Sequence, residues 1–263
     1  MRKLLLGDEA IAQAAIDSGL SGVYAYPGTP STEITEFIQL REEKRGDAEN
    51  KICCRWATNE KTAMEGALGM SYMGKRALVC MKHVGMNVAA DPFVNSAMTG
   101  VNGGLVVVAA DDPSMHSSQN EQDSRFYGKF AMMPIFEPSN QQEAYDMTRA
   151  AFELSEAVKL PVLMRVTTRM AHSRAVVNVT EEPRKQNEIN RPEDVRTWIL
   201  LPAFAKKRYV QLLAQQDDLM KASVESKFNF YRKGTNPERG VIATGIAYNY
   251  YMENCANCEE RKP

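Results

Sequence analysis

The run L-V-V-V-A-A at residues 105–110 decides the fold class, because six consecutive apolar residues predict a strand that is buried on both faces of a sheet. Similar apolar runs and amphipathic helical segments alternate on both sides of it. We expect strands at residues 22–26, 52–56, 76–81 and 162–166, and helices at residues 8–18, 59–73 and 141–157. This alternation predicts an α/β fold with a parallel sheet covered by helices on both faces.

The pattern divides the chain into three parts. Residues 1–176 carry the strands and helices of the α/β domain, and residues 177–239 read as a polar linker followed by a charged helix. Residues 240–263 then begin with R-G-V-I-A-T-G-I-A-Y, which predicts a strand, a turn at Gly245 and the opening of a helix. Because one strand and one helix cannot close a core, we expect either the start of a second α/β domain that is truncated or a unit that packs on the first domain.

The composition indicates a chain with a sizeable core and little net charge. Hydrophobic residues make up 44% of the 263 residues, and the formal net charge is −1. This balance does not indicate a nucleic-acid partner or an anionic membrane surface, and no apolar run is long enough to span a bilayer. Three of the five cysteines lie in strand-like apolar runs, where reduced thiols are expected, so a cytoplasmic protein is predicted. They are Cys53, Cys54 and Cys80.

The strongest local motif is N-E-K-T-A-M-E-G-A-L-G-M-S-Y-M-G at residues 59–74. It places Glu60 in the first turn of a helix, directly after a predicted strand. The small residues Ala63, Gly66 and Ala67 would allow another group to approach this helix closely. An acid in a first turn also complements the helix dipole, so the motif alone leaves a catalytic and a structural interpretation open. Glu65, on the same helix, is expected to be a solvated charge.

Three polar segments follow predicted strands and are further candidates. The turn Y-P-G-T-P-S at residues 26–31 lies where α/β folds place ligands, although it also reads as a capped helix start. The run K-H-V-G-M-N at residues 82–87 contains His83 at a strand end, where a histidine is as a rule structural. The polar run at residues 111–125 is expected to be a surface loop that can carry a site or be simply solvated.

Several motifs are missing. The sequence contains no phosphate-binding G-x-x-x-x-G-K-[ST], no G-x-G-x-x-G and no G-x-S-x-G. Cys255 and Cys258 form a C-x-x-C, but one pair cannot complete a four-ligand metal site, and we interpret it as incidental. No cluster of four cysteines is present to hold an iron–sulfur centre, so no metal site is expected within this chain.

Taken together, the motifs resemble the thiamine-diphosphate-dependent 2-oxoacid:ferredoxin oxidoreductases, and in particular the large (alpha) subunit of their indolepyruvate branch. The turn at 26–31 and the N-E helix at 59–74 are similar to the family in general. The segments M-K-H-V-G-M-N-V-A-A-D-P (81–92), A-D-D-P-S-M-H-S-S-Q-N-E-Q-D-S-R (110–125) and L-P-V-L-M-R-V-T-T-R-M-A-H-S-R (160–174) resemble the indolepyruvate branch. The resemblance covers nearly all of residues 1–175 and returns at residues 240–250.

The resemblance implies that the α/β domain is the one that binds the aminopyrimidine ring of thiamine diphosphate. Glu60 matches the catalytic carboxylate that hydrogen-bonds a ring nitrogen of the cofactor. Other residues match positions near the cofactor or the substrate. The cofactor side comprises Pro27, Gly28, His83, Val84, Gly85 and Asn87, and the substrate side comprises Thr29, Ser31 and His116.

The resemblance also implies what the complete enzyme requires. Thiamine diphosphate with Mg²⁺ would be completed by a pyrophosphate domain that this chain lacks. The complete enzyme would contain 4Fe-4S clusters, use coenzyme A, and oxidise indolepyruvate or other aryl pyruvates to an acyl-CoA. Its expected partners are a second (beta) subunit and ferredoxin, in an oligomer without nucleic acid or membrane.

Two other interpretations remain open at this point. One is the pyrimidine-domain subunit of a non-redox thiamine-diphosphate 2-oxoacid decarboxylase, although residues 240–250 speak against it because such short subunits lack a further domain. The other is a non-catalytic binding module of the same fold.

Overall fold

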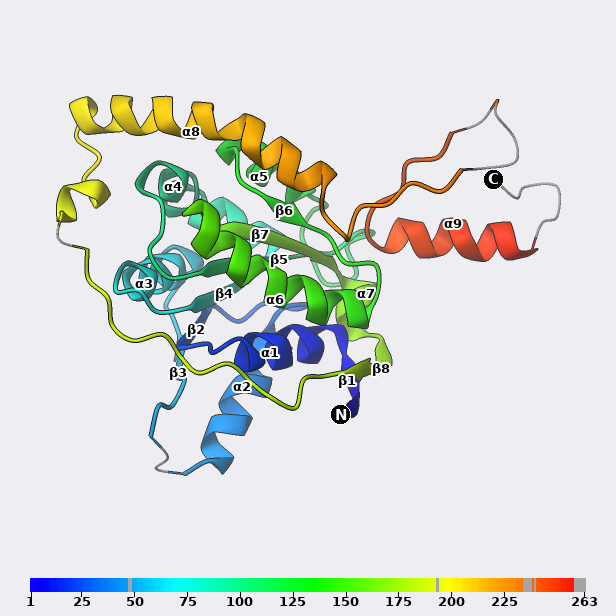
Figure 1. The fold of residues 1–263 in the computed structure, drawn as a ribbon. Coiled ribbons are helices and arrows are strands. Elements are labelled where there is room, and N and C mark those ends of the chain that lie inside the picture. Colours follow the sequence, from blue (N-terminus) through cyan, green and yellow to red (C-terminus); the bar gives the residue numbers. More distant parts are fainter. Residues whose placement is uncertain (47–48, 193, 234–237, 239, 258–263) are drawn as a thin grey trace.

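A computed structural model describes residues 1–46, 49–192, 194–233, 238 and 240–257 of the chain. Its centre is a six-stranded sheet in which every neighbouring pair of strands is parallel, in the order β3-β2-β4-β5-β7-β6 (Figure 1). The strands are β2 (Gly22–Ala25), β3 (Cys53–Trp56), β4 (Ala77–Lys82), β5 (Leu105–Asp111), β6 (Ile135–Phe136) and β7 (Val162–Thr167). The predicted parallel sheet is confirmed, and the apolar run that decides it forms the central β5.

Helices cover both faces of this sheet, also as predicted (Figure 1). Alternate residues of β4 and β5 point to opposite faces, so each face carries its own core. Leu78 and Val106 pack in the core under α1 (Gly7–Asp17), α2 (Thr32–Lys44) and α6 (Gln141–Val158). Val79 and Val107 pack in the core under α3 (Glu60–Tyr72) and α4 (His83–Thr99).

Five short elements were not predicted from the sequence. The strands β1 (Arg2–Leu6) and β8 (Arg174–Asn178) form a separate antiparallel two-stranded sheet, which joins the two ends of the domain and extends just past residue 176. The helix α5 (Arg125–Ala131) and the two-residue β6 follow the loop after β5. The short helix α7 (Thr168–His172) begins directly after β7.

A linker and a long helix wrap around the outside of the domain. The chain crosses the surface without regular structure, forms the 3₁₀ helix η1 (Val195–Trp198) and continues into α8 (Pro202–Val224), which lies across α4 (Figure 1). Only Leu212 of α8 is buried. Gln215 donates a hydrogen bond of 2.7 Å to the carbonyl oxygen of Val158, and Trp198 stacks on Tyr72 with ring centroids 4.4 Å apart. The predicted linker and charged helix are therefore present.

The last part of the chain contains a helix but no strand within the described residues. Residues 240–244 are extended without strand pairing, and α9 (Ile246–Asn257) follows at the side of the domain (Figure 1). Asn249 donates a hydrogen bond of 2.6 Å to the carbonyl oxygen of Ser139. The expected strand at 240–244 is thus not formed in the described part of the chain. A second domain beyond this point stays a prediction, and Cys258 and the side chain of Cys255 lie outside the described residues.

Two smaller expectations are also settled. Cys80 is buried as expected, whereas Cys53 and Cys54 are only half-buried, because β3 is an edge strand. No helix among the residues described is both long and apolar enough to cross a membrane.

A buried cation joins four segments on the α6 side of the sheet. Arg76, which has no exposed surface, donates hydrogen bonds of 2.9 and 2.6 Å to Glu156 and of 2.8 Å to Glu153 on α6. It also donates to the carbonyl oxygen of Ser18 at 3.0 Å. Asn187 of the linker donates to Glu156 at 2.8 Å. Burial alone would raise the pKa of Glu156, but the hydrogen bonds from Arg76 and Asn187 outweigh it and lower the pKa to about 2.

We predict that Arg76→Ala strongly destabilises the chain. The substitution leaves the half-buried Glu156 with only the more distant Arg184, at 3.9 Å, as a cationic partner, a loss worth about 3 kcal/mol in the free energy of unfolding. Chemical denaturation of the 263-residue chain measures it. The control Arg174→Ala changes an exposed arginine of β8 and should alter the unfolding free energy by no more than about 0.5 kcal/mol. Equal, small effects of both substitutions would contradict the assigned role of Arg76.

Candidate functional site

The carboxyl ends of the parallel strands form one edge of the sheet, and the segments that follow them meet there. The chain passes from β2 outward to β3 and then crosses back to β4, so its direction across the sheet reverses between β2 and β4. In open α/β sheets a crevice lies outside the strand ends at such a reversal. The turn at residues 26–31 follows β2, Glu60 follows β3, and His83 follows β4.

Glu60 and Gly85 lie in direct contact at this edge. A β-carbon added to Gly85 would come within 2.6 Å of Oε1 and 2.7 Å of Cγ of Glu60. Glu60 is 9% exposed, and no hydrogen bond or ion pair joins its carboxylate to another of the described residues. The site therefore presents a nearly buried carboxylate with free acceptor oxygens, which lies over a backbone that has no side chain.

Local sequence explains why Glu60 begins the helix. Asn59 caps α3, because its side-chain oxygen accepts a hydrogen bond of 2.9 Å from the backbone N–H of Thr62. Ala63 and Ala67 are fully buried on the side of α3 that faces the core. The predicted small-residue face therefore packs α3 closely against the domain. Glu65 is exposed, as expected.

The polar segment after β4 forms the first turn of a helix. α4 begins at His83, so His83, Val84 and Gly85 all belong to its first turn. His83 is fully buried, and its Nε2–H donates a hydrogen bond of 3.0 Å to the carbonyl oxygen of Asn120. Nδ1 of this imidazole is buried and has no partner among the described residues. Asn87 is exposed one turn further on and accepts a hydrogen bond from the hydroxyl of Tyr127.

The turn at residues 26–31 is held by its own hydrogen bonds. Gly28 donates its backbone N–H to the hydroxyl of Thr32 at 2.9 Å, and the buried Ser31 donates its hydroxyl to the carbonyl oxygen of Gly28 at 2.8 Å. The hydroxyl of Ser31 is therefore already used inside the turn. Thr29 and Pro27, in contrast, are exposed at the edge. A β-carbon on Gly28 would lie 3.3 Å from Cβ of Lys82, so the ends of β2 and β4 are close together.

Lys82 is a site residue that the sequence analysis did not select. It is 8% exposed at the end of β4, and its ammonium group donates a hydrogen bond to the carbonyl oxygen of Ser117. It therefore joins the turn after β2 to the loop after β5. Only its position directly before His83 in the sequence pointed to it.

Asp112 anchors the loop that follows β5. Its carboxylate accepts hydrogen bonds from Ser118 Oγ at 2.6 Å, from the N–H of Ser117 at 2.8 Å and from Thr168 Oγ1 at 2.7 Å. Burial alone would raise the pKa of Asp112, but these hydrogen bonds outweigh it and lower the pKa to about 2. His116 lies in the loop so anchored and is exposed. Among the described residues, no hydrogen bond links the His116 side chain to Glu60 or His83.

A second buried charge pair lies beside this loop. Arg165 on β7 donates a hydrogen bond of 2.7 Å to the fully buried Asp111, and it also pairs with Glu137. Glu137 pairs with Arg125 at 3.3 Å, and Arg125 donates to Thr244 at 3.0 Å, directly before α9. This network, which the sequence did not reveal, connects the loop after β5 with the C-terminal helix.

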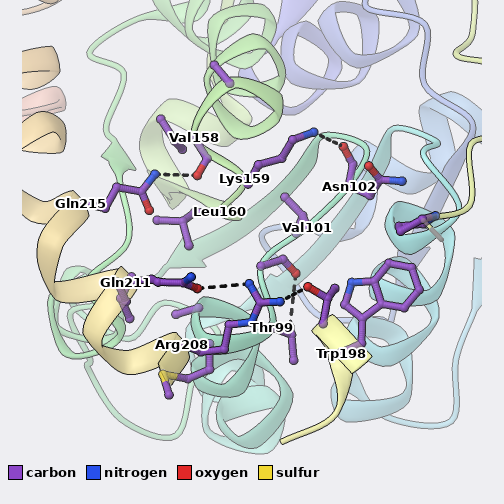
Figure 2. A pocket seen from close by; sticks show the side chains of 17 residues that line it. Thr99, Val101, Asn102, Val158, Lys159, Leu160, Trp198, Arg208, Gln211 and Gln215 are labelled. Carbon is purple, nitrogen blue, oxygen red and sulfur yellow. Dashed lines mark hydrogen bonds between the residues drawn. The ribbon is translucent and has the colours of Figure 1, made fainter. Parts of the chain in front are cut away.

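A separate hollow lies on the opposite edge of the sheet. It has a volume of about 560 Å³ where α8 and η1 cross the domain, and Val101 and Leu160, which precede β5 and β7, line its floor (Figure 2). Arg208, Gln211 and Trp198 line its outer side. Because this hollow is at the amino ends of the strands, it is separate from the candidate site around Glu60.

Comparisons with known proteins find relatives over nearly the whole chain. The family described as "Pyruvate flavodoxin/ferredoxin oxidoreductase, thiamine diP-bdg" matches residues 13–253. The chain is 42% identical over 261 residues to the indolepyruvate oxidoreductase subunit IorA of Archaeoglobus fulgidus, which covers 98% of this chain and 41% of that protein. The subunit of the same name from Thermococcus kodakarensis is 42% identical over 260 residues, covering 97% and 39%. The chain thus spans well under half the length of these relatives.

The fold is also similar to a solved structure. The 2-oxoglutarate:ferredoxin oxidoreductase of Magnetococcus marinus, determined with 2-oxoglutarate, coenzyme A and succinyl-CoA bound, matches with a TM-score of 0.67. The match covers 97% of this chain and 52% of that one, at 16% identity. At this identity the likeness establishes the fold alone.

We predict that the stability contributed by Asp112 depends on pH. Its folded-state pKa of about 2 lies below the ordinary value of about 3.9, so the contribution is fully present above about pH 4 and is lost as the pH falls through about 2. Asp112→Asn should therefore lower the unfolding free energy by about 1–2 kcal/mol at pH 6, and this difference should shrink below pH 4. Denaturant unfolding of both chains from pH 6 to pH 2.5 measures it.

Ser118→Ala is the matched variant, because it removes one of the donors to Asp112. It should reproduce part of the loss with the same dependence on pH. A difference between wild type and Asp112→Asn that stays constant over the whole range would show that the anchoring hydrogen bonds do not lower this pKa.

Proposed function

Because the chain belongs to the pyruvate flavodoxin/ferredoxin oxidoreductase family of thiamine-diphosphate-binding proteins, we propose that it is the aminopyrimidine-binding part of an enzyme that oxidatively decarboxylates indolepyruvate and other aryl pyruvates. The relatives at 42% identity are named as indolepyruvate oxidoreductase subunits, which supports the substrate class. The match runs to residue 253 and so includes α9, which favours an oxidoreductase over a short non-redox decarboxylase subunit.

The contact between Glu60 and Gly85 carries this proposal. An aminopyrimidine ring needs a carboxylate that faces it and a backbone surface on which it can lie. Glu60 offers oxygens without another partner, and the space beside it would be filled by any side chain at residue 85. Gly28 leaves comparable room at the end of β2. The residues present therefore fit the cofactor that the family description names.

Glu60 would act on a proton. A carboxyl group that is held away from bulk water can share a proton with a weakly basic ring nitrogen, and would thereby favour the imino form of the ring, whose exocyclic nitrogen can accept a proton. Thiamine diphosphate supplies the electron sink for decarboxylation when it is bound. This chain would orient the ring, hold the proton at Glu60 and exclude water. The burial of Glu60 and His83 supports the exclusion of water.

The other candidate residues surround this centre. His83 has a buried and unpaired Nδ1, and Val84 and Asn87 lie on the same helix turns as the Gly85 backbone. We propose that these residues line the cofactor side together with Pro27 and Gly28. Thr29 and His116 are exposed and available on the substrate side, whereas Ser31 would act by holding the turn.

The complete enzyme needs more than this chain contains. We propose that Mg²⁺ and the diphosphate are bound by a further domain, that 4Fe-4S clusters pass the electrons to ferredoxin, and that coenzyme A accepts the acyl group. The relatives are named as subunits, which supports a second, beta subunit and an oligomer. A cytoplasmic location is proposed from the free thiols of Cys53, Cys54 and Cys80.

We predict that Glu60→Gln abolishes most of the turnover of the complete enzyme. Glutamine keeps the shape of the side chain but cannot exchange a proton with the ring, and the loss of an acid–base group lowers turnover on the order of a hundredfold or more. The stability should change by about 1 kcal/mol or less, because a first-turn charge contributes little. Aryl-pyruvate-dependent reduction of ferredoxin or a viologen dye, with a melting curve, measures both.

Glu65→Gln is the control for this experiment, because Glu65 is exposed on the same helix and should be close to neutral. Near-normal turnover of Glu60→Gln would show that the catalytic carboxylate lies elsewhere, and so would loss of turnover in Glu65→Gln.

We predict that Gly85→Ala impairs catalysis without impairing folding. The added β-carbon would come within 2.6 Å of Glu60 Oε1, so the Glu60 carboxylate must move. Because it ends a flexible side chain, this movement need not disturb the fold. Because alanine favours a helix over glycine by up to about 1 kcal/mol, the melting temperature should stay or rise. Turnover should fall on the order of a hundredfold, since catalytic groups displaced by about 1 Å lose that much.

Gly69→Ala is its matched control on α3. A β-carbon at residue 69 meets nothing within 4 Å, so this variant should gain stability and keep full turnover. If Gly85→Ala and Gly69→Ala behave alike, the close contact with Glu60 has no functional consequence.

A further inference from the structure

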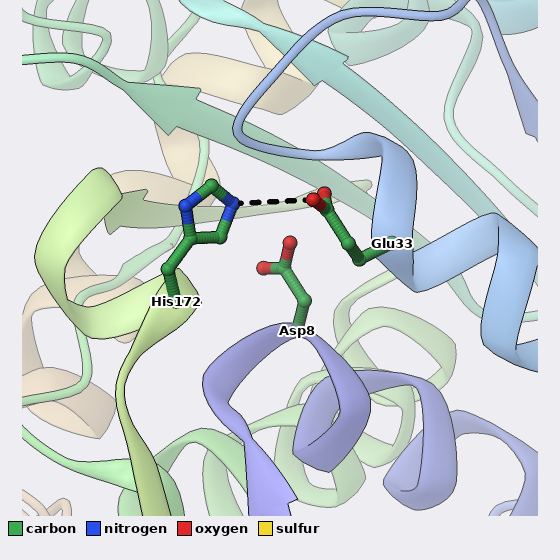
Figure 3. Close-up of side chains that lie close together, drawn as sticks. All are labelled: Asp8, Glu33 and His172. Carbon is green, nitrogen blue, oxygen red and sulfur yellow. Dashed lines mark ion pairs between the residues drawn. The ribbon is translucent and has the colours of Figure 1, made fainter. Parts of the chain in front are cut away.

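Three side chains that can bind a metal ion lie together away from Glu60. Asp8 comes from the first turn of α1, Glu33 from the first turn of α2 and His172 from the end of α7. One ligand atom of each lies within 4.8 Å of the others. Figure 3 shows the Asp8 carboxylate directed toward the space between the His172 ring and the Glu33 carboxylate. The proposed catalytic function uses none of them.

Asp8 is the unusual member of this cluster. Its side chain has no exposed surface, and neither of its carboxylate oxygens has a hydrogen-bond partner among the described residues. Oε2 of Glu33 is likewise buried without a partner there. An ionised carboxylate that is buried in this way costs several kcal/mol unless a positive charge compensates it. Burial and then the charges of Glu33 and Glu9 raise the pKa of Asp8 well above its usual range.

The geometry suits a small ion that binds both nitrogen and oxygen. His172 Nε2 lies 3.4 Å from Glu33 Oε1. Two ligands that each lie about 2.0–2.1 Å from a tetrahedral ion are about 3.3–3.4 Å apart. One imidazole with two carboxylates is a ligand set for Zn²⁺ or a similar transition metal, whereas Mg²⁺ and Ca²⁺ take oxygen ligands. The side chains of His172 and Glu33 are each 35% exposed, so an ion and a water ligand can reach the site.

We propose that Asp8, Glu33 and His172 form a binding site for one divalent transition-metal ion of the Zn²⁺ class. The ion connects the starts of α1 and α2 with the end of α7. Since α2 begins directly after the turn at residues 26–31, the ion also fixes that turn at the sheet edge. Its role is structural, and it stands apart from the Mg²⁺ that the complete enzyme requires.

The test is Zn²⁺ binding to the 263-residue chain, free of any affinity tag and freed of metal with a chelator. Cys255 and Cys258 are replaced by serine, because a C-x-x-C can bind Zn²⁺ itself. Isothermal titration calorimetry should give one ion per chain with a Kd in the micromolar range or below, and Zn²⁺ should raise the melting temperature by several degrees. Mg²⁺ at the same concentration should bind much more weakly.

Asp8→Asn and His172→Gln should each weaken Zn²⁺ binding at least about tenfold. Glu36→Gln, one turn further along α2 and exposed, is the matched control and should bind as wild type does. His172→Gln changes a partly exposed residue, so it keeps the test valid if Asp8→Asn fails to fold. The absence of stoichiometric Zn²⁺ binding would overturn the proposal. Zn²⁺ binding that survives His172→Gln would equally overturn it. So would a higher melting temperature of Asp8→Asn together with a wild-type melting temperature that Zn²⁺ does not change, because this result would indicate a proton shared between Asp8 and Glu33 in place of a metal ion.

Discussion

The Glu60 carboxylate can lie at the sheet edge only because residue 85 has no side chain. α3 and α4 start from β3 and β4, which are separated by β2, and the parallel arrangement brings both helix starts to the same edge. The first turns of the two helices then approach so closely that a β-carbon at residue 85 would clash with Glu60. The site therefore depends on two features together: the strand order, which sets the direction of both helices, and one glycine, which sets their distance. Asn59 adds the third requirement, since its cap fixes the residue at which α3 begins.

Paired charges hold the surrounding segments in place. Arg76 ties the linker and α6 to the start of β4, while Arg165 and Arg125 tie the loop after β5 to residue 244. Each of these arginines donates hydrogen bonds to two or more acceptors. The planar guanidinium group, with its five N–H donors in a fixed geometry, suits this better than the ammonium group of a lysine. Apolar contacts add to these charges, since Phe228 and Ile246 pack against the core of the domain and Trp198 of the linker stacks on Tyr72.

The central sheet could be predicted because each of its main strands is buried on both faces and reads as a continuous apolar run. β1 and β8 could not, because each is largely exposed and their pairing joins opposite ends of the domain. In the candidate site, the position of Glu60 at a helix start could be predicted from its own motif, whereas its proposed role came from the family resemblance. The helical placement of His83, the anchoring by Asp112 and the role of Lys82 depend on contacts with distant segments, and no local pattern encodes those. The proposed role of Gly85 came from the resemblance, and the structure adds its close contact with Glu60.

Most buried charges among the described residues obey one rule, and Asp8 departs from it, as the nearly buried Glu60 of the candidate site also does. Arg76, Arg165 and Asp112 are almost fully buried, and each is matched by opposite charge or by several hydrogen-bond donors. Asp8 is buried as deeply, and its neighbours within reach are a second carboxylate and an imidazole. A proton on one oxygen of Asp8 would give that oxygen a role as a donor, but it would not supply donors to all the other buried oxygens of Asp8 and Glu33. A cation bound at the centre contacts both carboxylates and the imidazole nitrogen at once, so it compensates the whole cluster from a single position.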